Sequence, residues 1–127
     1  MIYGVGTDLV EIQRIERVLK RFGDRFARRI LCEPELQRFR AHKQPVTYLA
    51  KRFAAKEAFT KALGTGIHAP ANCHGFWVVN LKSGQPQLEF SSELRKLLEK
   101  RRIQRSHLSL TDEREMACAT VILESDD

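Results

Sequence analysis

The sequence has few cysteines, few aromatic residues and no long apolar run. The three cysteines, Cys32, Cys73 and Cys118, are an odd number without CxxC spacing, which argues against a disulfide framework or a zinc site. The longest apolar stretch, residues 116–123, is far shorter than the roughly 18 residues that a membrane helix needs. The first residues contain no basic, apolar leader, so we expect a cytoplasmic protein that does not enter the membrane.

Length and composition predict one small globular domain. The chain has 127 residues, of which 43% are hydrophobic and 30% are charged. No repeat and no linker rich in Gly, Ser or Pro divides it, so we expect a single domain over residues 1–127. A chain of this size buries little surface for a self-sufficient enzyme with a deep cleft, which favours an oligomer.

Positive charge is concentrated in the first half of the chain. Residues 1–61 contain 14 Lys and Arg against 7 Asp and Glu, whereas residues 62–127 contain 8 against 9. The first half is therefore suited to a negative partner: nucleic acid, a phosphorylated ligand, an acidic protein or an anionic membrane. Composition alone does not choose among these.

The pattern of apolar residues predicts an α+β fold with a mainly antiparallel sheet packed against a long helix. A strand, three helices, a hairpin, a helix and a second hairpin follow one another. Their expected ranges are 2–7, 11–31 with an interruption at Gly23, 33–40, 47–63, 76–81 with 87–90, 92–102, and 107–111 with 116–123.

Arginines recur on one face of the first predicted helix. Arg14, Arg17, Arg21, Arg25 and Arg28 lie three or four residues apart, opposite an apolar stripe. This row is either a solvated face or a surface that binds an acidic partner.

Three polar motifs are candidates for chemistry. Asp8 follows the first strand, although an Asp here is also a favoured helix N-cap. The segment 51–61 places Glu57 and Lys61 on a face that should be apolar and ends at Gly64-Thr65-Gly66, although this pair could be an ordinary i,i+4 salt bridge. His107 heads a row of alternate polar residues, which could equally be the exposed face of a sheet.

Phosphoryl transfer would unite these motifs. Two carboxylates, Asp8 and Glu57, suit Mg²⁺, which binds one or two carboxylates together with substrate phosphates. Nearby bases would hold the remaining phosphate charge.

The motifs, in this order and at these separations, resemble the 4′-phosphopantetheinyl transferase superfamily, and most closely its short bacterial holo-[acyl-carrier-protein] synthases. The resemblance covers essentially the whole chain. It rests on residues 2–12, on the segment 52–59 with Lys61 and the glycine turn 64–66, and on the strands 107–111 and 116–123.

The resemblance implies a 4′-phosphopantetheinyl transferase fold and the transfer of phosphopantetheine from coenzyme A to a serine of apo-acyl carrier protein, in support of fatty acid biosynthesis. Asp8 and Glu57 would bind Mg²⁺, with Mn²⁺ as the alternative metal. Lys61 would contact the phosphates, and either Lys61 or Glu57 would act as the general base. The remaining residues that would bind coenzyme A are Lys43, Arg52, Lys56, Gly64, Gly66 and His107, with His42 as a weaker addition.

Members of this length resemble homotrimers with active sites between subunits. Acyl carrier proteins are acidic, so the resemblance implies that the arginine row is the docking face for the carrier protein. Its main residues would be Arg14, Arg21 and Arg25. The alternatives are a small basic nucleic-acid-binding protein and a non-enzymatic trimeric scaffold. The first explains the positive charge, but Glu57 opposes phosphate binding unless a cation intervenes, and aromatic residues are too few for base stacking.

Overall fold

The computed structural model describes residues 1–126 and has the predicted α+β architecture. The order of strands and helices is also as predicted, but the first strand and the fourth are longer than the sequence suggested. In chain order the elements are β1 (Ile2–Glu11), α1 (Ile12–Phe22), α2 (Asp24–Ile30), α3 (Glu33–Ala41), α4 (Pro45–Leu63), β2 (Phe76–Asn80), β3 (Pro86–Phe90), α5 (Ser92–Lys100), β4 (Ile103–Asp112) and β5 (Met116–Ser125).

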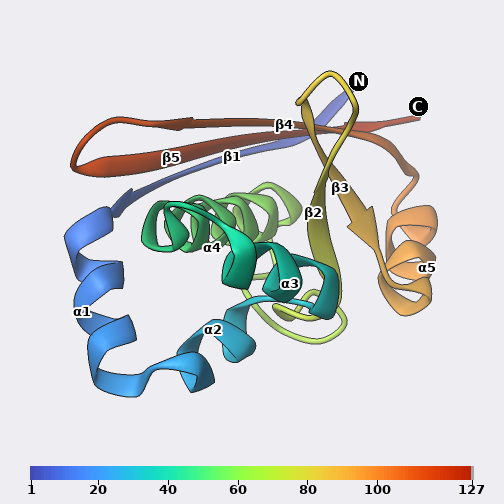
Figure 1. Cartoon of the computed structure of the whole chain (residues 1–127). Helices are drawn as coiled ribbons and strands as arrows, with labels where there is room; N and C mark the ends of the chain where they lie inside the picture. Colours follow the sequence, from blue (N-terminus) through green and yellow to red (C-terminus); the bar gives the residue numbers. More distant parts are fainter. Residues whose placement is uncertain (127) are drawn as a thin grey trace.

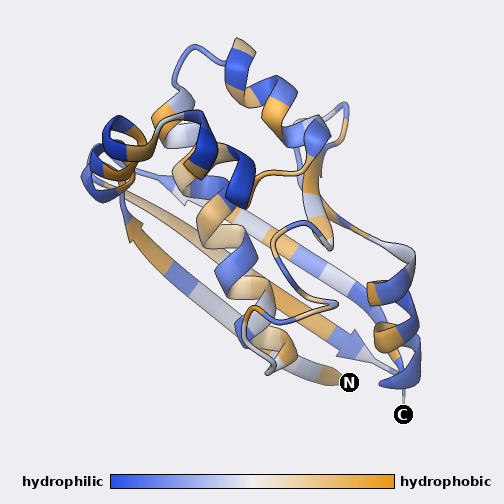
Figure 2. Cartoon of the chain, turned by 90° about the horizontal axis from the view of Figure 1, so that it is seen from below, coloured by the Kyte–Doolittle hydropathy of each residue, from blue (hydrophilic) through white to orange (hydrophobic). Residues whose placement is uncertain are grey.

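A three-stranded antiparallel sheet forms one layer, in the order β1-β5-β4. The helices all lie on one side of it, with α4 directly against the strands, and the β2-β3 hairpin crosses beside α4 (Figure 1). Figure 2 views the molecule from the helix side and shows α4 running along the sheet. No helix within residues 1–126 combines the length and apolar character that spanning a membrane requires.

The two faces of the sheet differ in their surroundings. On the inner face, Ala117, Ala119 and Val121 of β5 are fully buried under α4. On the outer face, Val5 and Leu9 of β1 are 58% and 63% exposed. No element within residues 1–126 covers this outer face, so a row of apolar side chains is left in solvent (Figure 1).

Two glycines in β1 bring the strand into direct contact with α4. A Cβ atom on Gly6 would lie 1.9 Å from the Ala58 carbonyl oxygen, and one on Gly4 would lie 2.0 Å from that of Ala62. Real Cβ atoms do not approach backbone this closely. Any larger residue at either position would therefore push the helix away from the strand.

The N-terminal half turns sharply at the interruption predicted for the first long helix. Gly23 has φ 63°, a left-handed conformation that glycine adopts without strain, and it separates α1 from α2. Asp8 is not a helix N-cap, because β1 continues to Glu11 and α1 begins at Ile12.

We predict that Gly6→Ala lowers the free energy of unfolding by about 3 kcal/mol, at the upper end of the usual cost of overpacking. The added methyl group would meet the backbone of α4, which cannot move aside like a flexible side chain. Chemical denaturation measures the change. Gln87→Ala is the control, because it also places an alanine in a strand but at an exposed position. An equally large loss in both variants would contradict the packing explanation.

Candidate active site

Asp8 and Lys61 meet where β1 crosses α4. The Lys61 Nζ donates hydrogen bonds to Asp8 Oδ1 at 2.9 Å and to the Thr7 carbonyl at 3.1 Å. The Asp8 side chain is only 15% exposed. Asp8 lies on the same face of β1 as Gly6, so the close approach of α4 at Gly6 places the end of Lys61 against this carboxylate.

Glu57 lies one helical turn before Lys61 and is half-buried. Burial raises the pKa of its carboxyl above the ordinary value of 4.5, and the negative charge of Asp8 raises it further. The positive charges of Lys61 and Arg14 act in the opposite direction. Two carboxylates thus share one site, and their repulsion would be relieved by a cation bound between them.

The donor set suits a magnesium ion. Within residues 1–126, no three His, Cys, Asp or Glu side chains are grouped as a metal cage. Mg²⁺ does not need such a cage, because it keeps several waters and commonly binds one or two carboxylates together with substrate phosphates. The Asp8 and Glu57 carboxylates would fit that kind of partial coordination.

Arg52 belongs to a separate, cationic cavity of about 200 Å³. Its guanidinium lies 4.2 Å from the centre of the Tyr48 ring, and its Nη2 donates to Asn80 Oδ1 at 2.8 Å. Arg52 and Tyr48 are 4% and 3% exposed, yet Arg52 Nε and the Tyr48 hydroxyl form no hydrogen bond of good geometry with any atom of residues 1–126. Arg38 and His42 also line the cavity. Buried donors without partners, in a basic cavity, are suited to an anionic oxygen.

Sequence reasoning missed Tyr48 and Asn80. Tyr48 could have been found, because it precedes Arg52 by four residues on the same helix face. Asn80 comes from the β2-β3 hairpin, and no local pattern connects it to α4. Lys43, which the resemblance assigned to coenzyme A, is exposed in the short connection between α3 and α4, beside this cavity but not in its wall.

The assignment of Lys56 to phosphate binding is wrong in this structure. Its side chain is fully buried, and its Nζ donates to Glu35 Oε1 at 2.7 Å and to the carbonyls of Ile30 and Cys73. Glu35 is equally buried and accepts a hydrogen bond from the Val78 amide. Lys56 therefore holds α2, α3 and the segment before β2 around α4, and it does not face solvent.

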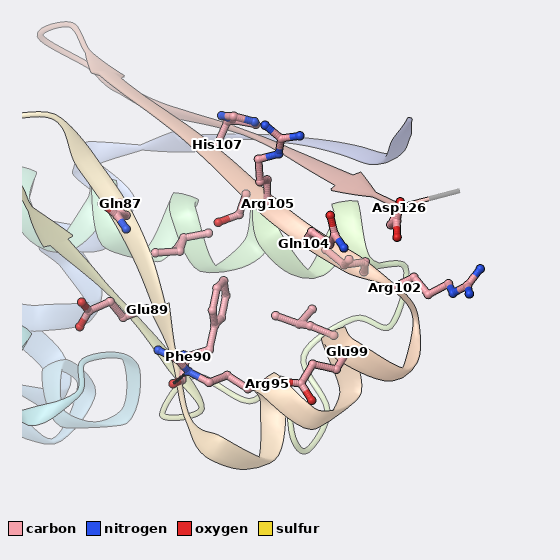
Figure 3. A pocket seen from close by; sticks show the side chains of 14 residues that line it. Gln87, Glu89, Phe90, Arg95, Glu99, Arg102, Gln104, Arg105, His107 and Asp126 are labelled. Carbon is pink, nitrogen blue, oxygen red and sulfur yellow. Dashed lines mark hydrogen bonds between the residues drawn. The ribbon is translucent and has the colours of Figure 1, made fainter.

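His107 also lies away from the two carboxylates in this chain. It is on the outer face of β4, where it hydrogen-bonds Glu124 of β5. Figure 3 shows His107 and Arg105 at the edge of a cavity of about 800 Å³ between β3, α5 and β4. Asp8, which lies on the inner face of β1, does not line that cavity. The polar row headed by His107 is thus an exposed sheet face within one chain.

The glycine turn ends α4 as predicted. Gly64 and Gly66 have φ values of 87° and 69°, so both adopt the left-handed conformation that favours glycine. Both glycines are exposed, and the turn begins three residues after Lys61.

One of the predicted docking arginines, Arg25, lines an apolar hollow. Arg25 and Arg29 line a cavity of about 360 Å³ together with Val18, Phe22, Phe26 and Ile30. Within residues 1–126, Arg14, Arg21 and Arg25 form no ion pair, whereas Arg17 and Arg28 pair with nearby acids. Arg14 also acts on the pKa of Glu57, so this face adjoins the carboxylate site.

Residues 4–121 match the family model of the 4′-phosphopantetheinyl transferase superfamily. The chain belongs to this superfamily. It is 50% identical over 124 residues to the holo-[acyl-carrier-protein] synthase of Nitrosospira multiformis, an alignment that covers 98% of this chain and 99% of that relative. It is 52% identical to the Vibrio cholerae holo-[acyl-carrier-protein] synthase, with 98% of each chain covered.

Solved members of the superfamily share the fold. The crystal structure of holo-[acyl-carrier-protein] synthase from Neisseria meningitidis has a TM-score of 0.96 and 46% sequence identity, covering 98% of this chain and all of that one. The Bacillus anthracis synthase, solved in complex with coenzyme A (3′,5′-ADP), has a TM-score of 0.83 and 38% identity, covering 99% of both chains. The predicted fold class and the predicted family are both confirmed.

Proposed function

We propose that this transferase moves the 4′-phosphopantetheine group of coenzyme A onto a serine of apo-acyl carrier protein. The observation that carries the proposal is the group formed by Asp8, Glu57 and Lys61, in a chain that is half identical to synthases named for this reaction over nearly its full length. The serine oxygen forms a bond to the β-phosphorus, the bond between that phosphorus and the bridging oxygen breaks, and adenosine 3′,5′-bisphosphate leaves. The hydroxyl proton passes to a base in the Glu57–Lys61 pair.

Asp8 and Glu57 are the residues that would hold a magnesium ion, or manganese in its place. Such an ion supplies charge neutralisation to the pyrophosphate and the leaving oxygen. Lys61 contributes a second positive charge from the protein itself, on a side chain that is 52% exposed and can turn from Asp8 to a phosphate. Together these groups position the reactants and balance negative charge, which is most of what phosphoryl transfer requires.

The cavity at Arg52 supports a second phosphate contact. Its unpartnered Arg52 Nε and Tyr48 hydroxyl would both be satisfied by a phosphate of coenzyme A. Arg52 and Glu57 are five residues apart on α4, which places them about 140° apart around the helix. One chain therefore presents the carboxylates and the cationic cavity on different sides of α4.

A homotrimer with active sites between subunits would bring the carboxylates of one chain next to the Arg52 cavity of a neighbouring chain. These are the two halves of the proposed site. The uncovered outer face of the sheet supports such an assembly, because Val5 and Leu9 of β1 lie beside Ile122 and Cys118 of β5 on one apolar surface. In this arrangement one subunit supplies Asp8, Glu57 and Lys61 and its neighbour supplies Arg52. His107, which lies on the same outer face, would then reach a neighbouring subunit.

The arginine face on α1 and α2 supports docking of the acidic carrier protein. Arg14, Arg21 and Arg25 are free for an acidic partner within the described residues, and the hollow at Phe22 and Phe26 can accept an apolar side chain. Because Arg14 is close enough to influence Glu57, a carrier protein bound here would bring its serine towards the carboxylates.

We predict that Glu57→Gln abolishes turnover while the protein stays folded and trimeric. Glutamine keeps the shape of the side chain but removes the charge that the cation requires. Removing a carboxylate that repels Asp8 should leave the melting temperature unchanged or higher in the absence of metal, since the pKa of Glu57 is raised in the folded state. Formation of holo-acyl carrier protein measures turnover, native mass measures the trimer, and thermal denaturation measures the melting temperature. A fully active variant would rule out Glu57 as a metal ligand.

The same variant tests whether sites are shared. Arg52→Met should also lose activity, and trimers reassembled from equal amounts of Glu57→Gln and Arg52→Met chains should regain part of it, because some interfaces then contain two intact halves. A mixture of Glu57→Gln with Asp8→Asn chains is the matched control, since both changes damage the same half. Activity in neither mixture would place the whole site within one subunit.

We predict that Arg14→Glu with Arg21→Glu raises the KM for the carrier protein by about tenfold or more while changing the KM for coenzyme A less than twofold, because charge complementarity governs association with the acidic partner. Lys96→Glu with Lys100→Glu makes the same charge change on α5 and should alter neither value. Steady-state kinetics with each substrate varied in turn decides this. Equal losses for both substrates would exclude the docking face.

A further inference from the structure

One side chain joins the end of α4 to two other elements. The last carbonyls of a helix have no partner within it, and Leu63 is the final residue of α4. The Arg101 Nη1 donates to the Leu63 carbonyl at 3.1 Å and also to the Tyr3 hydroxyl of β1 at 3.1 Å. A cation is favoured at a helix C-terminus, so this contact holds the last carbonyl of α4 in place.

Arg101 is itself held firmly at the end of α5. Its backbone amide donates to the Leu97 carbonyl at 3.1 Å. The next residue, Arg102, accepts from the amide of Asp126 at 2.8 Å, which joins this corner to the end of β5. The half-buried Arg101 side chain therefore spans from an anchored backbone to α4 and β1.

The two glycines of the turn that follows α4 are exposed, whereas Thr65 and Ile67 are half-buried. A Cβ atom placed on Gly64 would meet nothing within 4 Å, and one on Gly66 would meet only the His68 side chain. The turn has local hydrogen bonds, from the Gly64 amide to the Thr60 carbonyl and from the His68 amide to the Gly66 carbonyl. The polar contact that Arg101 makes with Leu63 therefore adds to the core packing of Leu63 in setting the direction of the turn relative to the sheet.

We propose that Arg101 is a positioning residue for coenzyme A, which aims the Gly64–Gly66 turn by fixing the Leu63 carbonyl. This inference rests on the proposed function, because it takes that turn to be part of the nucleotide pocket. Arg101 acts through the backbone of α4 and touches no reacting atom. Arg95, on the same helix, donates to the Phe90 carbonyl beside it, and among the described residues its side chain has no hydrogen bond to α4.

Arg101→Met tests the proposal, because it keeps the apolar stem and removes both hydrogen bonds. We expect the KM for coenzyme A to rise about tenfold, with kcat and the KM for the carrier protein within twofold of the unmodified protein. Arg101→Lys, which can still donate to Leu63, should recover most of the affinity. Arg95→Met is the matched control and should leave every value unchanged.

Calorimetric titration with coenzyme A separates this proposal from the proposed function. If the protein transfers nothing to a carrier protein, the proposed function is overturned. The dissociation constants of the Arg101 variants for coenzyme A would still decide the positioning role. Tyr3→Phe removes one of the two partners without disturbing the fold and should weaken binding of coenzyme A by a smaller factor. A lower melting temperature with unchanged affinity for coenzyme A would make Arg101 purely structural and overturn the proposal.

Discussion

The direct contact between β1 and α4 is the constraint on which the rest of the structure depends. Because Gly4 and Gly6 have no side chains, the helix lies against the backbone of the strand at Ala62 and Ala58. This close contact lets the Lys61 side chain hydrogen-bond Asp8. It also brings the Glu57 carboxylate close enough to Asp8 for the two negative charges to interact. The candidate active site is thus a consequence of two residues that contribute no functional group.

Neighbouring residues of α4 have opposite roles because they point in different directions. Lys56 points into the protein, where Glu35 and two carbonyls satisfy its charge in full. Glu57 points to the edge of the helix packing, where the negative charge of Asp8 disfavours ionisation of the Glu57 carboxyl and helps to raise its pKa. The buried pair stabilises the arrangement of helices around α4, whereas the carboxylate pair stores a repulsion that a bound cation would relieve.

The sequence was sufficient to predict the order of elements and the break at Gly23, because both follow from local spacing. The resemblance assigned Lys56 to coenzyme A, and no local pattern shows that Glu35 from another helix lies beside this lysine and buries its charge. His107 lies on the polar strand face that the alternation predicted, and within one chain it contacts Glu124, so its contact with coenzyme A stays a prediction. The cavity at Arg52 depends on Asn80, which only the tertiary fold brings to α4.

The most direct test is the intact mass of apo-acyl carrier protein after incubation with this protein, coenzyme A and Mg²⁺, beside a matched sample containing EDTA. The account predicts a gain of one phosphopantetheine group in the first sample and none in the second. No gain on an authentic apo acceptor, with a folded protein, would contradict the proposed transfer. An equal gain with EDTA would leave the transfer intact and contradict the role given to Asp8 and Glu57.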